Sequence, residues 1–477
     1  MINHEIFREY DIRGIADRDL TSPVVQSLGR AFAAYLKQMG ISGVTVGYDA
    51  RLSSPRLCEA MASGLVSQGI DVTIIGFCPT PVLYFSLFHL SPGAGVMITG
   101  SHNPAEFNGF KLCIGQETIY GEEIQKLKRI MAETAQNGPL PACIPGNLEN
   151  RPILPEYIQH LQSLFSTLPD VRLRVVLDAG NGTAGVAAPA IIRAMGCEVI
   201  ELFSWPDGRF PNHHPDPTVL KNITTLIETV RQTKADVGIA FDGDSDRIGV
   251  VDEQGNILWG DQLMVLFSRD ILRTRPGSTF VSEVKCSQVM YDDIRANGGK
   301  AIMWRTGHSL IKAKMKETQA SLAGEMSGHL FFADRYFGYD DAIYAACRTI
   351  ELLKKHKAQH GADAALSSML AGLPKTFNTP EIRFDCPDAL KFSVVERARE
   401  LFTRNGLAMS PKEVITVDGI RAVFPDGWGL IRASNTQPVL VMRFEAASQA
   451  SLAAIQKFME GHVRAIVAVL SGGRQDP

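Results

Sequence analysis

The chain has 477 residues, of which 45% are hydrophobic and 21% are charged, and its formal net charge is −3. This length predicts three or four domains, and the composition excludes an intrinsically disordered chain. The nearly balanced charge gives no reason to expect nucleic acid or an anionic membrane as a partner.

The eight cysteines are scattered along the chain, and no two of them form a C-x-x-C pair. We therefore expect buried thiols in a reducing compartment, and neither a zinc site nor a redox dithiol. The opening residues MINHEIFREYDIRG lack the apolar core of a signal peptide. No run approaches the roughly 18 apolar residues of a membrane span. These features predict a soluble, cytoplasmic protein.

Helix and strand patterns alternate over the first 110 residues. Thr21-Ser22-Pro23 predicts the start of a helix, with a hydroxyl cap and a proline in the first turn. The segments 44–49, 71–76 and 94–100 are short apolar strand patterns. This alternation predicts a mostly parallel sheet that helices cover on both faces.

The same alternation recurs further along the chain. The later strand patterns cover 172–182, 197–203, 236–246, 278–286, 300–307 and 320–329. Together with the first 110 residues these make three sets of strand patterns. In each set a strand runs into a glycine-bearing polar loop: TGSHNP, FDGDSDR or AGEMSGH. One α/β unit used three times would explain this pattern. The tail is rich in strand patterns between two helical stretches, which predicts a smaller α+β domain.

The predicted fold class is therefore α/β, with three similar α/β domains that contain mixed, mostly parallel sheets, and a smaller C-terminal α+β domain. The proline- and glycine-rich segment 137–155 is typical of a linker, and weaker breaks lie near 256–260 and 371–380. The predicted domains are 1–150, 151–256, 257–373 and 374–477.

The first polar loop presents a serine at the end of an apolar strand. Val96-Met97-Ile98 stops at Thr99-Gly100, and Ser101 and His102 follow. The loop is either a simple turn or a site where the serine reacts.

The second loop places Asp242, Asp244 and Asp246 at alternate positions. In an extended loop such carboxylates lie about 6–7 Å apart. In a cleft with a dielectric constant near 20, their repulsion is about 2–3 kcal/mol per pair, which a cation relieves. A polar turn is the alternative. An EF-hand is rejected, because Arg247 stands where that loop requires glycine. Oxygen ligands favour a hard ion such as Mg²⁺.

Two further motifs bear on function. RASNTQP (432–438) offers an arginine, hydroxyls and clustered N–H groups, so it suits either a phosphate site or a polar hairpin turn. Gly180, Gly182 and Gly185 match the dinucleotide-binding pattern, with Glu201 about 20 residues further on. A tight strand-to-helix turn selects glycines by itself, so this match alone is weak.

Taken together, five motifs resemble the α-D-phosphohexomutase family, in its phosphomannomutase/phosphoglucomutase branch. They occur in the family's order along nearly the whole chain. They are FREYDIRG (7–14), TGSHNP (99–104), FDGDSDR (241–247), GEMSGH (324–329) and RASNTQP (432–438). The opening motif favours this branch over the glucosamine branch, whose opening resembles FGTDGIRG.

The resemblance implies four domains around a central cleft and an isomerase that interconverts hexose 1-phosphate and hexose 6-phosphate, with mannose, glucose or both as the sugar. The reaction would use a phosphoserine enzyme and a hexose 1,6-bisphosphate intermediate, which also serves as activator. One Mg²⁺ per active site is implied. The expected partner is a phosphorylated hexose, and the chain would be a monomer or a homodimer.

The resemblance also implies roles for individual residues. Ser101 carries the phosphoryl group and helps Asp242, Asp244 and Asp246 to bind Mg²⁺. Lys111 matches a proposed general base, which needs a lowered pKa; a cation that holds phosphate is the alternative. His102 orients the serine loop or caps a turn. The other catalytic candidates are Arg13, Arg247, His308 and His329. The candidates for binding the sugar phosphate are Tyr10, Lys285, Glu325, Ser327, His329, Arg421, Arg432, Ser434, Asn435 and Thr436.

Three other functions remain open at this point: a phosphoglucosamine mutase, a metal-dependent serine phosphatase of sugar phosphates, and a nicotinamide-dependent oxidoreductase. A phosphatase would need water at the serine and no second phosphate loop. Hydride transfer would leave the acidic loop, the serine and RASNTQP unexplained.

Overall fold

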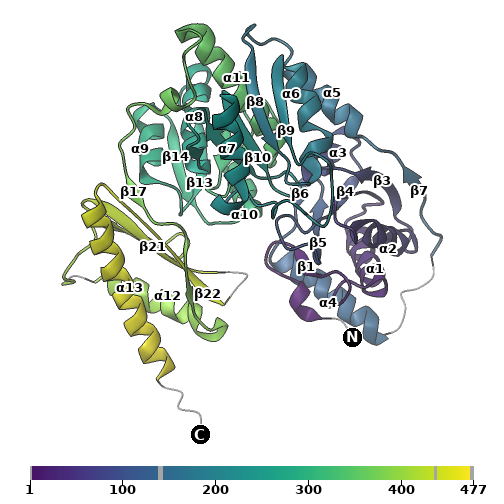
Figure 1. Ribbon diagram of the computed structural model, residues 1–477. Coiled ribbons are helices and arrows are strands. Elements are labelled where there is room, and N and C mark those ends of the chain that lie inside the picture. Colours follow the sequence, from purple (N-terminus) through teal and green to yellow (C-terminus); the bar gives the residue numbers. More distant parts are fainter. Residues whose placement is uncertain (1–2, 138–142, 405, 435–437, 473–477) are drawn as a thin grey trace.

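Three consecutive parts of the chain form sheets with one common strand order, and the last part forms a separate antiparallel sheet (Figure 1). The computed structural model describes residues 3–137, 143–404, 406–434 and 438–472. Among these described residues no helix is long and apolar enough to cross a membrane.

The first three sheets each combine parallel and antiparallel pairs of strands. In spatial order, the first sheet contains β1 (Ile12–Ile15), β5 (Phe107–Ile114), β4 (Gly93–Ile98), β2 (Gly43–Tyr48), β3 (Asp71–Phe77) and β7 (Leu148–Asn150), and β6 (Glu117–Thr118) pairs with β5. The second contains β12 (Ile257–Leu258), β11 (Ile248–Asp252), β10 (Val237–Phe241), β8 (Leu173–Asp178) and β9 (Cys197–Leu202). The third contains β14 (Lys300–Trp304), β13 (Thr279–Glu283), β15 (Leu322–Gly324) and β16 (Leu330–Phe332).

The fourth sheet is antiparallel throughout. It contains β17 (Phe377–Asn378), β22 (Val439–Ala446), β21 (Gly427–Ala433), β20 (Ile420–Phe424) and β19 (Glu413–Ile415), and β18 (Ile382–Asp385) also pairs with β22. Its helices are α12 (Asp388–Phe402) and α13 (Gln449–Ser471).

Helices cover the first three sheets. They are α1 (Ser22–Gln38), α2 (Ser54–Val66), α3 (Thr80–His89), α4 (Glu122–Asn137), α5 (Leu154–Leu164), α6 (Ala188–Ala194), α7 (Thr224–Thr233), α8 (Gly260–Thr274), α9 (Gln288–Ala296), α10 (His308–Thr318) and α11 (Ala342–His360). The predicted start of the first helix is confirmed, with Thr21 as N-cap and a proline in the first turn. The predicted hydroxyl cap is wrong, because the Thr21 side chain makes no capping hydrogen bond.

The repeated unit positions the polar loops. In each of the first three sheets, one strand pairs in parallel with its inner neighbour and antiparallel with the strand that follows it in the chain. The loops between these antiparallel pairs are 99–106 (the serine loop), 242–247 (the acidic loop) and 325–329 (the glutamate loop). The predicted α/β fold with three similar units and an α+β tail is therefore confirmed.

One hydrophobic core joins the first three parts. It runs from Ile75 in β3 through the second and third sheets to Leu366. The fourth part has a core of its own. A smaller cluster of Val284, Trp428 and Leu430 joins the third and fourth parts. The three loops therefore lie on parts that share a core, and the C-terminal unit packs against the third of them (Figure 1).

Candidate active site

The side chain of Ser101 lies against the acidic loop. Its hydroxyl donates a hydrogen bond to Asp242 Oδ2 at 2.8 Å, and its Oγ is 3.2 Å from Nδ1 of His102. Ser101 is only 3% exposed and has a φ of 47°, in the left-handed region. A Cβ added at Gly243 would lie 2.5 Å from the carbonyl oxygen of Ser101, so the two loops approach as closely as glycine allows.

Arg51, which the sequence did not single out, holds the serine loop in this position. Its buried guanidinium donates to the carbonyl oxygens of Ser101 at 2.8 Å and Asn103 at 2.6 Å, and also to those of Pro104 and Phe107. Asp49 lies 3.2 Å from its Nε and also accepts from the hydroxyl of Thr99. Arg51 therefore fixes the loop through its backbone.

The three aspartates of the acidic loop form one buried cluster. Asp242, Asp244 and Asp246 are each at most 1% exposed, and one oxygen from each lies within 4.8 Å of the others. Burial and the charges of Asp246 and Asp244 raise the pKa of Asp242 well above its usual value. Oδ1 of Asp244 and Oδ1 of Asp246 have no hydrogen-bond partner among the described residues. These orphaned oxygens and the uncompensated charge fit a divalent cation with oxygen ligands.

Lys111 is a partial counter-charge for this cluster. Its ammonium is 2.8 Å from Oδ2 of Asp244 and also contacts Asp246. Burial lowers the pKa of Lys111, but the carboxylates Asp244 and Asp246 outweigh burial and hold it well above its ordinary value. A general base needs the opposite shift, so the two carboxylates favour the charged form of Lys111.

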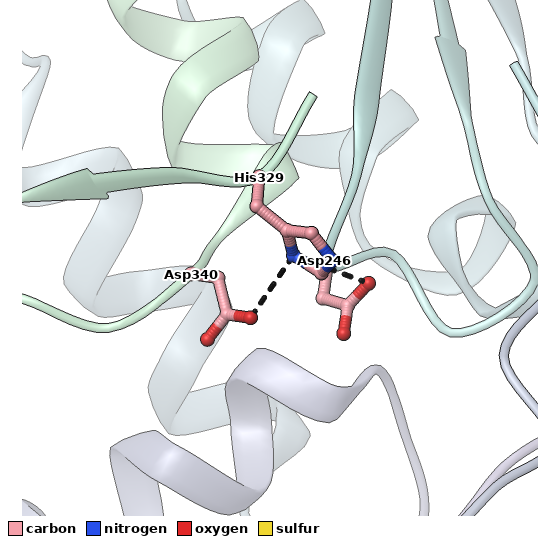
Figure 2. Close-up of side chains that lie close together, drawn as sticks. All are labelled: Asp246, His329 and Asp340. Carbon is pink, nitrogen blue, oxygen red and sulfur yellow. Dashed lines mark ion pairs between the residues drawn. The ribbon is translucent and has the colours of Figure 1, made fainter. Parts of the chain in front are cut away.

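Two histidines and an arginine lie on the other side of the acidic loop. Arg247 donates from Nε to Nε2 of His329 at 2.9 Å. Nδ1 of His329 is 3.1 Å from Asp340 and 3.8 Å from Asp246 (Figure 2). The rings of His308 and His329 stack with centroids 5.5 Å apart. Asp340 could not be found from the sequence, because FGYDD carries none of the motifs.

The remaining catalytic candidates lie close to the serine loop. Arg13 donates from Nη1 to the side chain of Asn103 at 2.8 Å. Burial, followed by the charges of Arg247 and Arg13, lowers the pKa of His102 well below its usual value. Burial and Lys312 do the same for His308. Both imidazoles are therefore neutral at pH 7.

The glutamate loop contacts the segment before α10, which in turn contacts the first part of the chain. Glu325 accepts from the N–H of Gly307 at 2.7 Å, and burial, then Glu283, raises its pKa. The hydroxyl of Tyr10 donates to the carbonyl oxygen of Thr306 at 3.1 Å. Ser327 is partly buried in the same loop.

Arg432 of the C-terminal unit and Lys285 of the third part bring further cations to this region. Arg432 donates to Asp418 at 2.9 Å, and Asp418 accepts from the N–H of Thr306 at 3.0 Å. Lys285 lies 3.3 Å from Glu381. The buried Ser434 directly precedes residues 435–437, so Asn435 and Thr436 lie outside the described residues.

Arg421 links the third and fourth parts of the chain. It is fully buried, donates to the carbonyl oxygens of Val284 and Cys286 at 2.6 and 2.7 Å, and stacks on Trp428. These contacts give it a structural role, and its expected role at the substrate stays a prediction.

The glycines of the dinucleotide-like pattern have a packing explanation. A Cβ at Gly182 would lie 2.6 Å from the carbonyl oxygen of Gly243, and one at Gly185 would lie 1.8 Å from that of Ser204. Glu201 forms an ion pair with Arg193, so its carboxylate already has a partner other than a ribose hydroxyl. The pattern therefore serves the close approach of this turn to the acidic loop.

Comparison with known proteins agrees with this arrangement. Four family models, described as phosphoglucomutase/phosphomannomutase domains I, II, III and C-terminal, match residues 4–138, 155–255, 259–377 and 381–462. The chain belongs to the phosphoglucomutase/phosphomannomutase family. The resemblance inferred from the five motifs is thus confirmed, while the predicted domain boundaries and site residues stay predictions.

Similar members of this family cover nearly the whole chain. A phosphomannomutase/phosphoglucomutase of Pseudomonas putida is 44% identical over 94% of both chains. One of Pseudomonas aeruginosa is 42% identical over 97% of this chain and 96% of its own. A phosphoglucomutase of Neisseria meningitidis is also 42% identical, over 95% and 96%. A crystal structure of a phosphoglucomutase/phosphomannomutase family protein from Burkholderia thailandensis has a TM-score of 0.88 and 40% identity over 98% of both chains.

As a member of this family, the chain is a phosphohexomutase, an enzyme of the isomerase class. The findings do not favour a glucosamine mutase, a phosphatase or an oxidoreductase. A phosphorylated sugar is accordingly its substrate.

Proposed function

We propose that this phosphohexomutase interconverts the 1- and 6-phosphates of both mannose and glucose, through phosphorylated Ser101 and a hexose 1,6-bisphosphate. Relatives named for both activities and relatives named for phosphoglucomutase alone are equally similar to the chain. Since mannose and glucose differ only at C2, we expect one site to accept both.

The contact between Ser101 Oγ and Asp242 supports the proposal most directly. A buried serine hydroxyl in contact with one of three clustered carboxylates, from a different sheet, is unusual for a structural turn. A phosphoryl group at Ser101 adds a charge of about −2. Arg13, Lys111 and Arg247 supply positive charge around it.

Phosphoryl transfer depends mainly on positioning and charge neutralisation. In the proposed step, a sugar hydroxyl oxygen attacks the phosphorus of phosphorylated Ser101. The bond between phosphorus and Oγ breaks, and the proton of the sugar hydroxyl passes to the leaving Oγ, so Ser101 becomes a free serine. In the reverse transfer, Oγ attacks the phosphate at the other end of the bisphosphate, the proton returns to the sugar oxygen, and the phosphoserine is restored.

Asp242, Asp244 and Asp246, with an oxygen at Ser101, would hold one Mg²⁺, which would neutralise charge on the transferring phosphoryl group. Their two orphaned buried oxygens support this assignment.

The bisphosphate must rebind with its ends exchanged, so each phosphate occupies two sites in turn. Arg432, Ser434 and the neighbouring residues Asn435 and Thr436 are proposed to hold the phosphate that is not transferred. Lys285, Glu325, Ser327 and Tyr10 are proposed to bind the sugar. Exclusion of water from the serine would prevent hydrolysis.

A coupled assay tests the proposal, with mannose 1-phosphate or glucose 1-phosphate, Mg²⁺ and a trace of glucose 1,6-bisphosphate. We expect both 6-phosphates to form and little inorganic phosphate to be released. Turnover of neither sugar phosphate would refute the proposal, turnover of only one would refute dual specificity, and release of phosphate at the rate of turnover would indicate a phosphatase.

A further inference from the structure

A cavity of about 490 Å³ lies between the first and third parts of the chain. Its walls come from α3 and residues 116–120 of the first part, and from α10 and residues 337–339 of the third. This volume is within the range of small-molecule binding sites. None of the lining residues is a candidate for catalysis, for binding of the sugar phosphate or for binding of Mg²⁺. The cavity is therefore separate from the site around Ser101.

Four aromatic rings form one wall of this cavity. The ring centroids of Tyr84 and Tyr339 are 5.3 Å apart, and those of Phe88 and Phe337 are 4.6 Å apart. The rings of Phe337 and Tyr339 are nearly parallel, with 8° between their planes. Phe337 is 37% exposed. A flat ring placed against this wall would remove its exposed apolar surface from water.

The charged residues on the walls are three cations and one carboxylate. Lys312 is 3.2 Å from Asp340, and Lys316 forms an ion pair with Glu117, so both lysines already have a carboxylate partner. Arg275, the C-cap of α8, has no ion-pair or side-chain hydrogen-bond partner among the described residues. A guanidinium pairs well with planar or tetrahedral anionic groups such as carboxylate and phosphate. We therefore expect an anionic group at Arg275.

The first turn of α10 adds an unsatisfied polar group. Ser309 lines the cavity and is only 2% exposed, and its hydroxyl has no hydrogen-bond partner among the described residues. A buried hydroxyl without a partner is unfavourable. A polar atom of a molecule bound in the cavity would satisfy it.

We propose that this cavity binds a small molecule that combines a flat aromatic ring with an anionic group. The ring lies against Phe337 and Tyr339, and the anionic group meets Arg275. Because the walls belong to two parts of the chain, the bound molecule holds the first and third parts together. The proposal does not depend on the reaction at Ser101. A cavity that holds only water is the competing explanation.

Fluorescence titration of the full chain tests the proposal with two probes that share one ring system. They are 8-anilinonaphthalene-1-sulfonate, which is an anion, and N-phenyl-1-naphthylamine, which is uncharged. We expect one saturable site for the sulfonate, weaker binding of the uncharged probe, and a Kd for the sulfonate that glucose 1-phosphate does not change. Absence of a saturable site, or displacement of the sulfonate by glucose 1-phosphate, would overturn the proposal.

Charge is tested with Arg275→Gln, and Arg273→Gln is the control because Arg273 is exposed on α8 and does not line the cavity. Arg275→Gln should raise the Kd of the sulfonate about 10-fold, as expected for loss of a charge-assisted hydrogen bond. It should leave the Kd of the uncharged probe unchanged. An unchanged Kd of the sulfonate, or an equal loss for both probes, would refute the assignment of the anionic group to Arg275.

The location is tested by filling the cavity. Ala313 lies on α10, lines the cavity and is exposed, so Ala313→Trp adds a large ring there without disturbing a core. It should abolish the saturable binding of both probes, whereas Ala454→Trp at an exposed position of α13 should bind them as the wild type does. If Ala313→Trp does not fold, Phe337→Ala takes its place and should weaken both probes. Wild-type binding in the folded variant would overturn the proposal.

Discussion

Asp244 is a buried carboxylate of the proposed Mg²⁺ site, and one of its oxygens is unsatisfied. Its Oδ2 accepts from Thr80 at 2.6 Å and from Lys111, while Oδ1 has no hydrogen-bond partner among the described residues. An unsatisfied buried oxygen is costly, and a bound cation removes that cost. Asp244→Asn removes one charge but keeps the shape, so the Mg²⁺ concentration for half-maximal activity should rise about 10-fold or more. An unchanged Mg²⁺ titration, compared with Asp207→Asn elsewhere in the same domain, would contradict the assignment.

Asp341, the N-cap of α11, should make stability depend on pH. It caps α11 through the N–H of Tyr344 and accepts from the hydroxyl of Tyr157. Burial raises its pKa to about 6. The folded state then binds a proton more tightly than the unfolded state, and the resulting stabilisation is lost as the pH rises from about 4 to about 6.

Asp341→Asn cannot ionise and can still cap the helix. Relative to the wild type, its unfolding free energy should therefore increase by up to about 3 kcal/mol between pH 4 and pH 7. Urea unfolding midpoints of both proteins across this range measure the difference. A constant difference would show that Asp341 does not titrate in this window.

Candidate site residues could be picked out from the sequence where they stand together in one short motif. Ser101 and the three aspartates each follow an apolar strand, and such strand ends meet at one edge of a sheet. Arg51, Asp340 and Lys312 could not be predicted, because their partners lie in other segments that only folding brings near. The stacking of Arg421 on Trp428 could not be predicted for the same reason.

At the scale of elements, the serine loop depends on Arg51. Four carbonyl oxygens of the loop accept from its planar guanidinium, and lysine cannot reproduce that fork. Arg51→Lys should lower kcat by about 100-fold through displacement of Ser101, and hydrogen exchange at 100–107 should become faster. Arg56→Lys on α2, which is partly exposed, is the control. A wild-type kcat for Arg51→Lys would show that the serine loop keeps its position without the hydrogen bonds of Arg51.

The start of α1 was predicted correctly from the proline in its first turn, although its hydroxyl cap was not. The dinucleotide-like glycines show the limit of such signals, because the same spacing that suits a pyrophosphate lets a turn of this chain pack on the acidic loop. Only the neighbouring backbone, which is remote in sequence, distinguishes the two explanations.

At the scale of the whole molecule, contacts between parts assemble the site. Lys111 joins the first and second parts, Tyr10 joins the first and third, and Asp418 joins the third and fourth. The C-terminal unit has a core of its own, and a smaller cluster that includes Val284 and Trp428 joins it to the third part.

Arg432→Ala should therefore raise KM about 10- to 100-fold, the loss expected for a charge-assisted hydrogen bond to phosphate, with a smaller effect on kcat. The exposed Arg464→Ala on α13 should leave both constants unchanged. An unaffected KM in Arg432→Ala, with unchanged thermal stability, would assign Arg432 to its contact with Asp418 alone.

The most direct test of the account follows the phosphoryl group itself. Dephosphorylated enzyme is mixed with glucose 1,6-bisphosphate and Mg²⁺, and peptide mass spectrometry locates the phosphate; the isolated phosphoenzyme is then mixed with glucose 1-phosphate. We predict one phosphate, on Ser101, which transfers to the sugar to regenerate the bisphosphate, and no labelling of Ser101→Ala. Phosphate on another residue, or turnover by Ser101→Ala at the wild-type rate, would contradict the account.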